Sequence, residues 1–281
     1  MNIYISADIE GTTGVVSWFQ CGRKDGEHPD FDFARRMMTE DVNAAVQGAR
    51  AAGAKRIVVK DSHGNSKNLL LDQLEEGVEL ISGHGSDDTR GMMVGVDASF
   101  DAALLVGYHA RAGTLHGVME HTISGRVHRM WINDEEQGEI GMSRGVAGAF
   151  EVPIVMISSD LAGAAEFEAM GLGGTTAVVK EGFGRYSARS LGRAEASAKI
   201  FEAARSGIEK RKNVQLYRPG KPVTFRIEFN RSEEADLAAR LVGVERVDAY
   251  TLEYTSDSFL QSHQMAWSIF AMDGLGAGSD N

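Results

Sequence analysis

Short apolar runs alternate with longer helical patterns along the first two thirds of the chain. The apolar runs have the length of buried strands, and apolar residues between them recur near the 3.6-residue spacing of a helix. Alternating strands and helices are typical of a parallel sheet covered by helices. We therefore predict an α/β fold, with a mainly parallel sheet flanked by helices in three layers. The predicted strands are residues 2–9, 56–60, 102–108, 153–158 and 177–180.

The longest helical pattern of this region covers residues 32–52. Farther along, two apolar runs at 126–132 and 137–140 flank the polar segment 133–136. Because polar residues between two apolar runs favour a turn, we predict a hairpin there. A helix rich in small residues is predicted to follow at 141–150.

The pattern changes after about residue 191. We predict two domains on this basis: a metal-binding α/β domain at residues 1–190 and a smaller C-terminal α+β domain at residues 191–281. The Gly-rich, polar tail from Gly274 is expected to be mobile. The second domain is predicted to contain helices at 193–212, 232–241 and 257–272, and strands at 222–229 and 246–254.

Composition and charge exclude several classes of protein. Of the 281 residues, 43% are hydrophobic and 25% are charged, as in ordinary globular domains. A net charge of -11 disfavours binding to a nucleic-acid backbone, which needs a basic surface. The N-terminal segment lacks the features of a secretion signal, and no apolar run approaches the roughly 20 residues of a membrane-spanning helix. The single cysteine, Cys21, suits a reducing compartment, so we predict a cytoplasmic protein that binds neither nucleic acid nor membrane.

Polar side chains follow four predicted strands at their carboxyl ends, where open parallel sheets bind ligands. Asp8 and Glu10 stand at positions i and i+2 of the first strand, so both point to the same side. Two like charges on one side need a cation between them. A metal site is therefore predicted where the strand ends converge. The other three strands end in Asp61 and His63, in His109, and in Asp160.

Carboxylates and imidazoles together form a mixed oxygen and nitrogen ligand set, which suits zinc and, less readily, manganese or cobalt. One aspartate that bridges two ions about 3.5–4 Å apart would make a hydrolytic centre that polarises a carbonyl and activates water. Such a centre needs a third carboxylate. Glu139, just past the predicted hairpin, is the candidate best placed by sequence context.

A histidine beyond the third strand is the candidate catalytic residue. His121 lies in the polar segment GVMEHTISG, where a neutral imidazole could act as general base, general acid or nucleophile. His116 is a weaker competitor in the same loop. The other histidines, among them His263 on the last predicted helix, are interpreted as structural or exposed. The sequence has no HExxH or P-loop motif, and its one cysteine lacks a histidine context for thiol catalysis.

Eight short motifs follow one another in a fixed order: SADIEG (6–11), MTED (38–41), KDSHG (60–64), ISG (81–83), GYHARAGT (107–114), GVMEHT (117–122), IND (132–134) and GEIG (138–141). This series resembles the zinc D-aminopeptidases of the dipeptide-transport operon type, over about the first 190 residues. Two positions depart from the family pattern. Leu115 and His116 stand where the family commonly has a shorter, proline-bearing stretch, and Ser143 stands where an asparagine is expected.

The resemblance implies a centre with two zinc ions per subunit and a catalytic histidine at His121. In that assignment Asp8 bridges the ions, Glu10 and His109 hold one of them, and His63 and Glu139 hold the other. The family activity is removal of the N-terminal residue from short peptides, often a D-amino acid, by ring-shaped homo-oligomers. Residues that could bind the two charged ends of a peptide are Asp160, Lys180 and Arg185.

Three functions are compatible with these observations. The leading one is a zinc aminopeptidase that acts on short peptides of the D-Ala-D-Ala type. An amidase or an L-peptide aminopeptidase on the same dinuclear scaffold is the enzymatic alternative. A metal-dependent peptide-binding protein of a transport system is the non-enzymatic alternative, and the presence of His121 argues against it.

Overall fold

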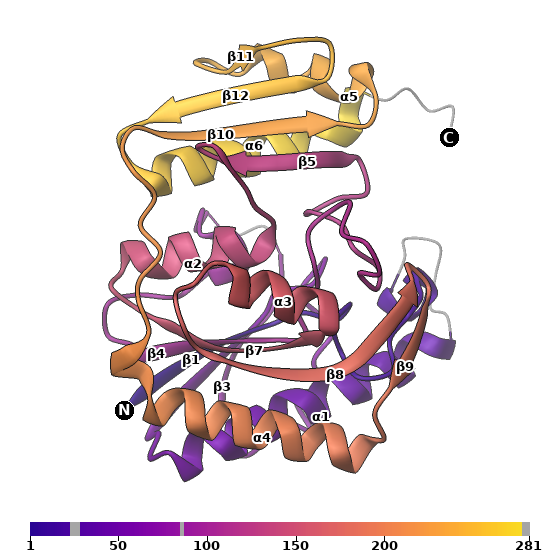
Figure 1. The fold of residues 1–281 in the computed structure, drawn as a ribbon, viewed down its shortest axis with the longest axis vertical. Helices are drawn as coiled ribbons and strands as arrows, with labels where there is room; N and C mark the ends of the chain where they lie inside the picture. Colours follow the sequence, from indigo (N-terminus) through magenta and orange to yellow (C-terminus); the bar gives the residue numbers. More distant parts are fainter. Residues whose placement is uncertain (23–28, 85–86, 277–281) are drawn as a thin grey trace.

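The computed structural model describes residues 1–22, 29–84 and 87–276 and contains two sheets (Figure 1). The larger sheet has seven strands in the order β3-β2-β1-β4-β7-β8-β9. All neighbours pair in parallel except β8 and β9. The strands are β1 (Asn2–Ala7), β2 (Arg56–Asp61), β3 (Glu79–Ile81), β4 (Ala102–Val106), β7 (Ile154–Asp160), β8 (Thr175–Gly184) and β9 (Ser187–Ser190).

Helices cover both faces of this sheet, which confirms the predicted three-layer α/β arrangement (Figure 1). Helices α1 (Pro29–Ala51) and α4 (Arg193–Glu209) pack on one face, and α2 (Glu139–Ala149) and α3 (Leu161–Ala169) on the other. Successive β1 side chains enter opposite cores, Ile3 and Ile5 toward α1 and Tyr4 toward α2. Burial on both faces explains why the strand sequences read as continuous apolar runs.

The smaller sheet is antiparallel and has the order β11-β12-β10-β5-β6. Figure 1 shows it beyond α2, with helix α6 (Phe259–Gly276) against it. Its strands are β5 (Val127–Ile132), β6 (Glu135–Glu136), β10 (Val223–Phe229), β11 (Glu245–Arg246) and β12 (Thr251–Ser256). The short helical elements that accompany the two sheets are η1 (Trp18–Cys21), η2 (Gly91–Met93), η3 (Arg211–Asn213), α5 (Ser232–Asp236) and η4 (Ala238–Arg240).

The prediction of the second hairpin strand is wrong. Residues 137–140 do not form a strand, because β6 is only Glu135–Glu136 and α2 begins at Glu139. A tight turn reverses the chain earlier than predicted, with Asn133 in the left-handed conformation at φ 56°. Glu139 therefore lies in the first turn of a helix, where a carboxylate is favoured.

The division at residue 190 remains a prediction, and the membership of the sheets crosses it. Strands β5 and β6 precede residue 190 but belong to the smaller sheet. Helix α4 follows residue 190 but packs against α1 on the larger sheet. Residues 277–281 of the tail expected to be mobile lie outside the described residues. In the part of the chain that the structure describes, no helix combines the length and the apolar character needed to cross a membrane.

Candidate metal centre and catalytic site

Three ligand-bearing segments meet at the carboxyl ends of β2, β1 and β4, which are neighbours in the larger sheet. Glycines let two of these segments touch through their main chains. A Cβ on Gly11 would lie 1.7 Å from the carbonyl oxygen of Tyr108, and one on Gly107, at φ +71°, would lie 2.2 Å from that of Asp8. The Gly11 N–H donates to the Gly107 carbonyl at 2.8 Å. This close approach sets Asp8 beside His109.

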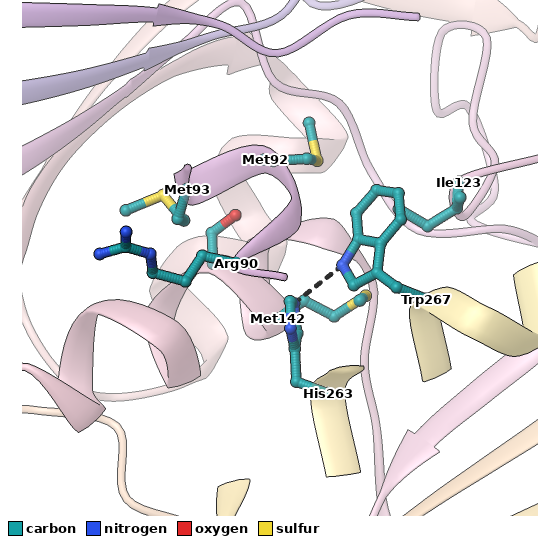
Figure 2. A pocket seen from close by; sticks show the side chains of 8 residues that line it. Arg90, Met92, Met93, Ile123, Met142, His263 and Trp267 are labelled. Carbon is teal, nitrogen blue, oxygen red and sulfur yellow. Dashed lines mark hydrogen bonds between the residues drawn. The ribbon is translucent and has the colours of Figure 1, made fainter. Parts of the chain in front are cut away.

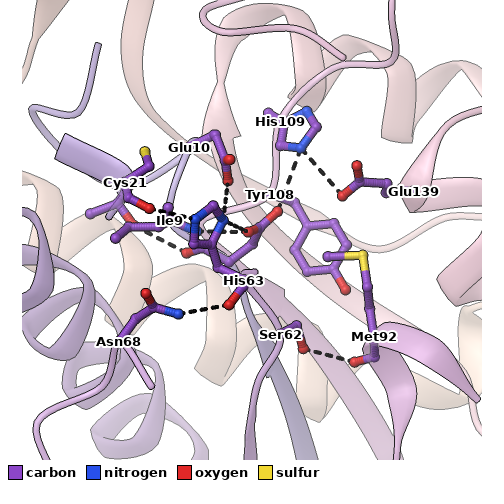
Figure 3. Close-up of polar contacts among 12 residues, drawn as sticks. Ile9, Glu10, Cys21, Ser62, His63, Asn68, Met92, Tyr108, His109 and Glu139 are labelled. Atoms are coloured by element: carbon purple, nitrogen blue, oxygen red, sulfur yellow. Dashed lines mark hydrogen bonds and ion pairs between the residues drawn. The ribbon is translucent and has the colours of Figure 1, made fainter. Parts of the chain in front are cut away.

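Asp8 is buried between the imidazoles of His63 and His109. Figure 3 shows these two rings together with Glu10 and Glu139. The Oδ1 atom of Asp8 is 3.3 Å from Nδ1 of His63, and its Oδ2 is 3.5 Å from Nε2 of His109. The two oxygens of one carboxylate therefore face two different imidazoles. This geometry suits a carboxylate that bridges two cations.

Two further carboxylates complete the cluster, one at each imidazole. Glu10 Oε2 is 3.0 Å from His63 Nδ1, and Glu139 Oε2 is 3.3 Å from His109 Nε2. The family-based assignment instead groups Glu10 with His109 and His63 with Glu139. Ligand atoms of Asp8, Glu10 and His109 also lie within 4.8 Å of one another, so the first of those groups is within ligand reach.

Each of the three imidazoles of the cluster is oriented by a main-chain carbonyl. One ring nitrogen donates to that carbonyl and the other faces the carboxylates, where its lone pair is available to a cation in the neutral ring. Such contacts set the tautomer that a metal ligand or a general base requires. The pairs are His63 Nε2 with Cys21 O at 3.0 Å, His109 Nδ1 with Ala110 O at 2.9 Å, and His121 Nδ1 with Met119 O at 3.0 Å.

His121 stands over the cluster, whereas His116 is exposed. The Nε2 atom of His121 lies 3.9 Å from Glu10 Oε1 and 3.8 Å from Glu139 Oε1. The ring stacks on His109 with centroids 4.1 Å apart and meets the ring of Trp18 edge-on at 5.0 Å. Burial, together with the charge of His109, lowers the pKa of His121. The imidazole is therefore held neutral, in the form that accepts a proton.

Sequence reasoning missed Trp18. Its indole N–H donates to the Tyr186 hydroxyl at 3.1 Å, which ties η1 to the β8–β9 hairpin beside His121. Trp18 lies far along the chain from His121, and no spacing pattern connects the two residues. Only the path of the loop after β1 brings them together.

The charge of the cluster fits a bound cation. Asp8, Glu10 and Glu139 are all at least 96% buried, and Asp8 Oδ2 and Glu10 Oε1 have no hydrogen-bond partner among the described residues. Burial and the charge of Glu10 raise the pKa of Asp8 to about 7. Burial opposes protonation of His63, but Glu10 and Asp8 outweigh it and raise the His63 pKa well above its ordinary value. Oxygen and imidazole donors around unpaired buried oxygens form a ligand set that zinc prefers.

Three comparisons with known proteins show what this chain is similar to. A family model described as D-aminopeptidase, of the peptidase M55 group, matches residues 1–268. The chain belongs to the D-aminopeptidase family. A D-aminopeptidase of Bacillus subtilis (strain 168) is 32% identical over 268 residues, which is 94% of each protein. The solved structure of the Zn-dependent D-aminopeptidase DppA from Bacillus subtilis, described as a self-compartmentalizing protease, superposes with a TM-score of 0.92 at 29% identity and covers 99% of both chains.

Membership in the D-aminopeptidase family confirms the resemblance found in the sequence and makes this protein a peptidase. The structure brings together all six side chains predicted for the site. They are Asp8, Glu10, His63, His109, His121 and Glu139.

The three side chains suggested for binding the ends of a peptide are engaged elsewhere. Asp160 caps α3, and its carboxylate accepts from the Gly163 and Val118 N–H groups. Lys180 is 2% exposed and donates only to main-chain carbonyls among the described residues. Arg185 pairs with Glu120 at 3.4 Å. These partners argue against direct roles in substrate binding.

Proposed function

We propose that the protein is a zinc-dependent D-aminopeptidase that removes the N-terminal residue from short peptides of the D-Ala-D-Ala type. The observation that carries this proposal is the buried cluster in which three carboxylates and three oriented imidazoles converge. The two relatives described above are a D-aminopeptidase and a Zn-dependent D-aminopeptidase, and both match nearly the whole chain.

Two zinc ions per subunit are proposed for this cluster. Asp8 would bridge them, because its two oxygens face different imidazoles. Glu10, His63, His109 and Glu139 would supply the remaining ligands. Bound zinc supplies positive charge that polarises the peptide carbonyl and makes water more acidic.

His121 is proposed to move the proton during hydrolysis. Its Nε2 accepts a proton from the water molecule as the oxygen of that water bonds to the peptide carbonyl carbon. The same nitrogen then donates the proton to the nitrogen of the leaving amine as the carbon–nitrogen bond breaks. The Met119 carbonyl fixes the Nδ1–H tautomer, so Nε2 faces the carboxylates throughout.

The proposed assembly is a ring-shaped homo-oligomer that encloses its active sites. Support comes from the solved relative, which is described as self-compartmentalizing and covers 99% of this chain. An enclosed site would restrict substrates to short peptides, which can diffuse into the ring.

Release of free amino acid from D-Ala-D-Ala and from L-Ala-L-Ala tests the proposal, with zinc-loaded protein and with or without a chelator. We expect release from the D-dipeptide that stops when the chelator removes zinc. Release from the L-dipeptide alone would replace the D-specific function with an L-aminopeptidase. No release from either dipeptide, with zinc still bound, would favour an amidase or a peptide-binding protein.

A further inference from the structure

A buried lysine holds the main chain of the segment that carries Asp8 and Glu10. Lys180 lies in β8, and its Nζ donates to three carbonyl oxygens of this segment. The distances are 2.5 Å to Glu10, 2.9 Å to Thr12 and 2.6 Å to Val15. An ammonium group has three N–H donors, so these carbonyls use its whole donor capacity.

A buried aspartate holds the same segment at Thr13. Asp41 lies in α1 and is 1% exposed. Its Oδ2 accepts from the Thr13 N–H at 2.9 Å, and both of its oxygens lie within 3.1 Å of the Thr13 hydroxyl. An ammonium group and a carboxyl group from different elements therefore both hold this segment.

Burial of these two ionisable side chains is unfavourable for folding, which suggests that the conformation they fix has a function. Burying a lysine costs free energy, and the loss of water is offset only by good hydrogen bonds. β8 is three places from β1 in the sheet, so Lys180 reaches across the carboxyl ends of the strands to the segment. Neither Lys180 nor Asp41 faces the cluster itself, and both end on main-chain groups or on Thr13.

We propose that Lys180 and Asp41 are positioning residues for zinc binding: they fix the main chain of residues 10–15 so that the Glu10 carboxylate stays beside Asp8 and His63. The proposal rests on the zinc centre of the proposed function. It assigns a purpose to Lys180 and to Asp41 of the MTED motif, whose side chains make no hydrogen bond to the side chains of the cluster. Glu10 is the only proposed ligand within residues 10–15, so only the ion that Glu10 would hold is expected to depend on Lys180 and Asp41.

The substitutions Lys180→Met and Asp41→Asn test the proposal separately. Lys180→Met keeps a long apolar stem and removes the donors, whereas Asp41→Asn keeps the size and removes the charge. Arg144→Met is the matched control, because Arg144 is also buried and donates to two main-chain carbonyls, of Phe167 and Gly173, away from the cluster. Each protein is stripped of metal and titrated with zinc against a competing chelator.

Both test variants should bind one zinc ion roughly 10- to 100-fold more weakly than the unsubstituted protein does. Their affinity for the other zinc ion should not change. The Thr13 amide hydrogen should also exchange faster in the metal-free variants. In Asp41→Asn a neutral amide oxygen accepts more weakly than a carboxylate, and in Lys180→Met the main chain around Thr13 is released. Arg144→Met should lose thermal stability and keep both zinc affinities.

Two results would overturn the inference. The first is wild-type zinc affinity for both ions in folded Lys180→Met or Asp41→Asn protein. The second is an equal loss of affinity in Arg144→Met, which would mean that the effect follows general destabilisation. If Lys180→Met does not fold, Asp41→Asn decides alone. An unsubstituted protein that binds no zinc would instead contradict the proposed function.

Discussion

His121 keeps a lowered pKa although two carboxylates lie within 4 Å of it. Burial and the neighbouring His109 outweigh the attraction of Glu10 and Glu139 for a proton. Stacking on His109 and the edge-on contact with Trp18 hold the ring in one orientation. A neutral imidazole with a fixed lone pair is the state in which a general base is useful at neutral pH.

Substitutions at His121 and Asp8 should separate catalysis from metal binding. His121→Ala removes the proposed general base and should lower kcat by at least about 100-fold, with zinc content unchanged. Asp8→Ala removes the bridging carboxylate and should abolish both zinc binding and activity. Zinc content by elemental analysis and dipeptide hydrolysis measure the two effects. Activity retained in either variant would contradict the assignment.

At the residue scale, the sequence was sufficient for the side chains of the cluster but not for their supports. Strand alternation places Asp8 and Glu10 on one side, and the strand ends bring His63 and His109 near them. The carbonyls that orient the imidazoles depend on the path of loops. Lys180 is among the residues suggested for the charged ends of a peptide, because its burial beside the loop after β1 leaves no signal in the sequence.

Among the elements, α6 is fixed by a buried histidine. His263 is 2% exposed and lies close to Phe225, Phe259 and Trp267, and its Nε2 accepts from the Trp267 indole N–H at 3.0 Å (Figure 2). Burial lowers the pKa of His263 to about 4. This confirms the interpretation of His263 as a structural residue.

His263 should make stability depend on pH in acid solution. The folded protein keeps the ring neutral down to pH about 4, whereas the unfolded chain takes up a proton below its ordinary pKa of about 6.5. Proton uptake therefore stabilises the unfolded state as pH falls from 6.5 to 4, and the free energy of unfolding decreases by about 3 kcal/mol over that range.

Urea unfolding between pH 7 and pH 4 measures this loss, with a chelator present throughout so that zinc does not contribute. His263→Gln keeps an acceptor for Trp267 and should flatten the pH dependence by a large part of that amount. His128→Gln is the control, since the His128 side chain is 51% exposed and its removal should leave the dependence unchanged. Parallel pH curves for His263→Gln and the unsubstituted protein would refute the prediction.

The sequence predicted the long elements better than the short ones. All five predicted strands of the parallel sheet exist, since burial on both faces gives them a strong apolar signal. Edge strands β3 and β9 were not predicted, because β3 is three residues long and β9 is mostly exposed. The helix predicted at 232–241 consists of the short α5 and a 3-10 turn.

Helix α2 connects the two sheets of the whole molecule. Its Ile140 and Val146 join the core of the larger sheet, and its Met142 joins the core of the smaller one. A Cβ on Gly145 would lie 2.0 Å from the Phe259 ring, so α2 and α6 are in close contact. Because α2 begins with Glu139, the packing of both sheets helps to set the position of this carboxylate in the cluster.

Removal of zinc should destabilise the whole molecule. Without the ions, Asp8, Glu10 and Glu139 are three buried carboxylates that repel one another. At free zinc about 1,000 times the dissociation constant, binding contributes about 4 kcal/mol, which corresponds to a rise in Tm of roughly 10 °C for a chain of this size. Calorimetry with zinc and with a chelator measures the difference. Asp8→Ala should show no zinc-dependent change, and a zinc-independent Tm in the unsubstituted protein would contradict the two-ion centre.

The pairing of β5 with β10 has a consequence for biosynthesis. A growing chain leaves the ribosome from its N-terminus, so residues 127–132 are made well before their partner at 223–229. Until then β5 presents an open edge, and the side of α2 that faces α6 is uncovered. Open edges and uncovered apolar surfaces favour aggregation. Completion of the smaller sheet is therefore a late event, and chaperones that bind nascent chains should find their target in the middle of this protein.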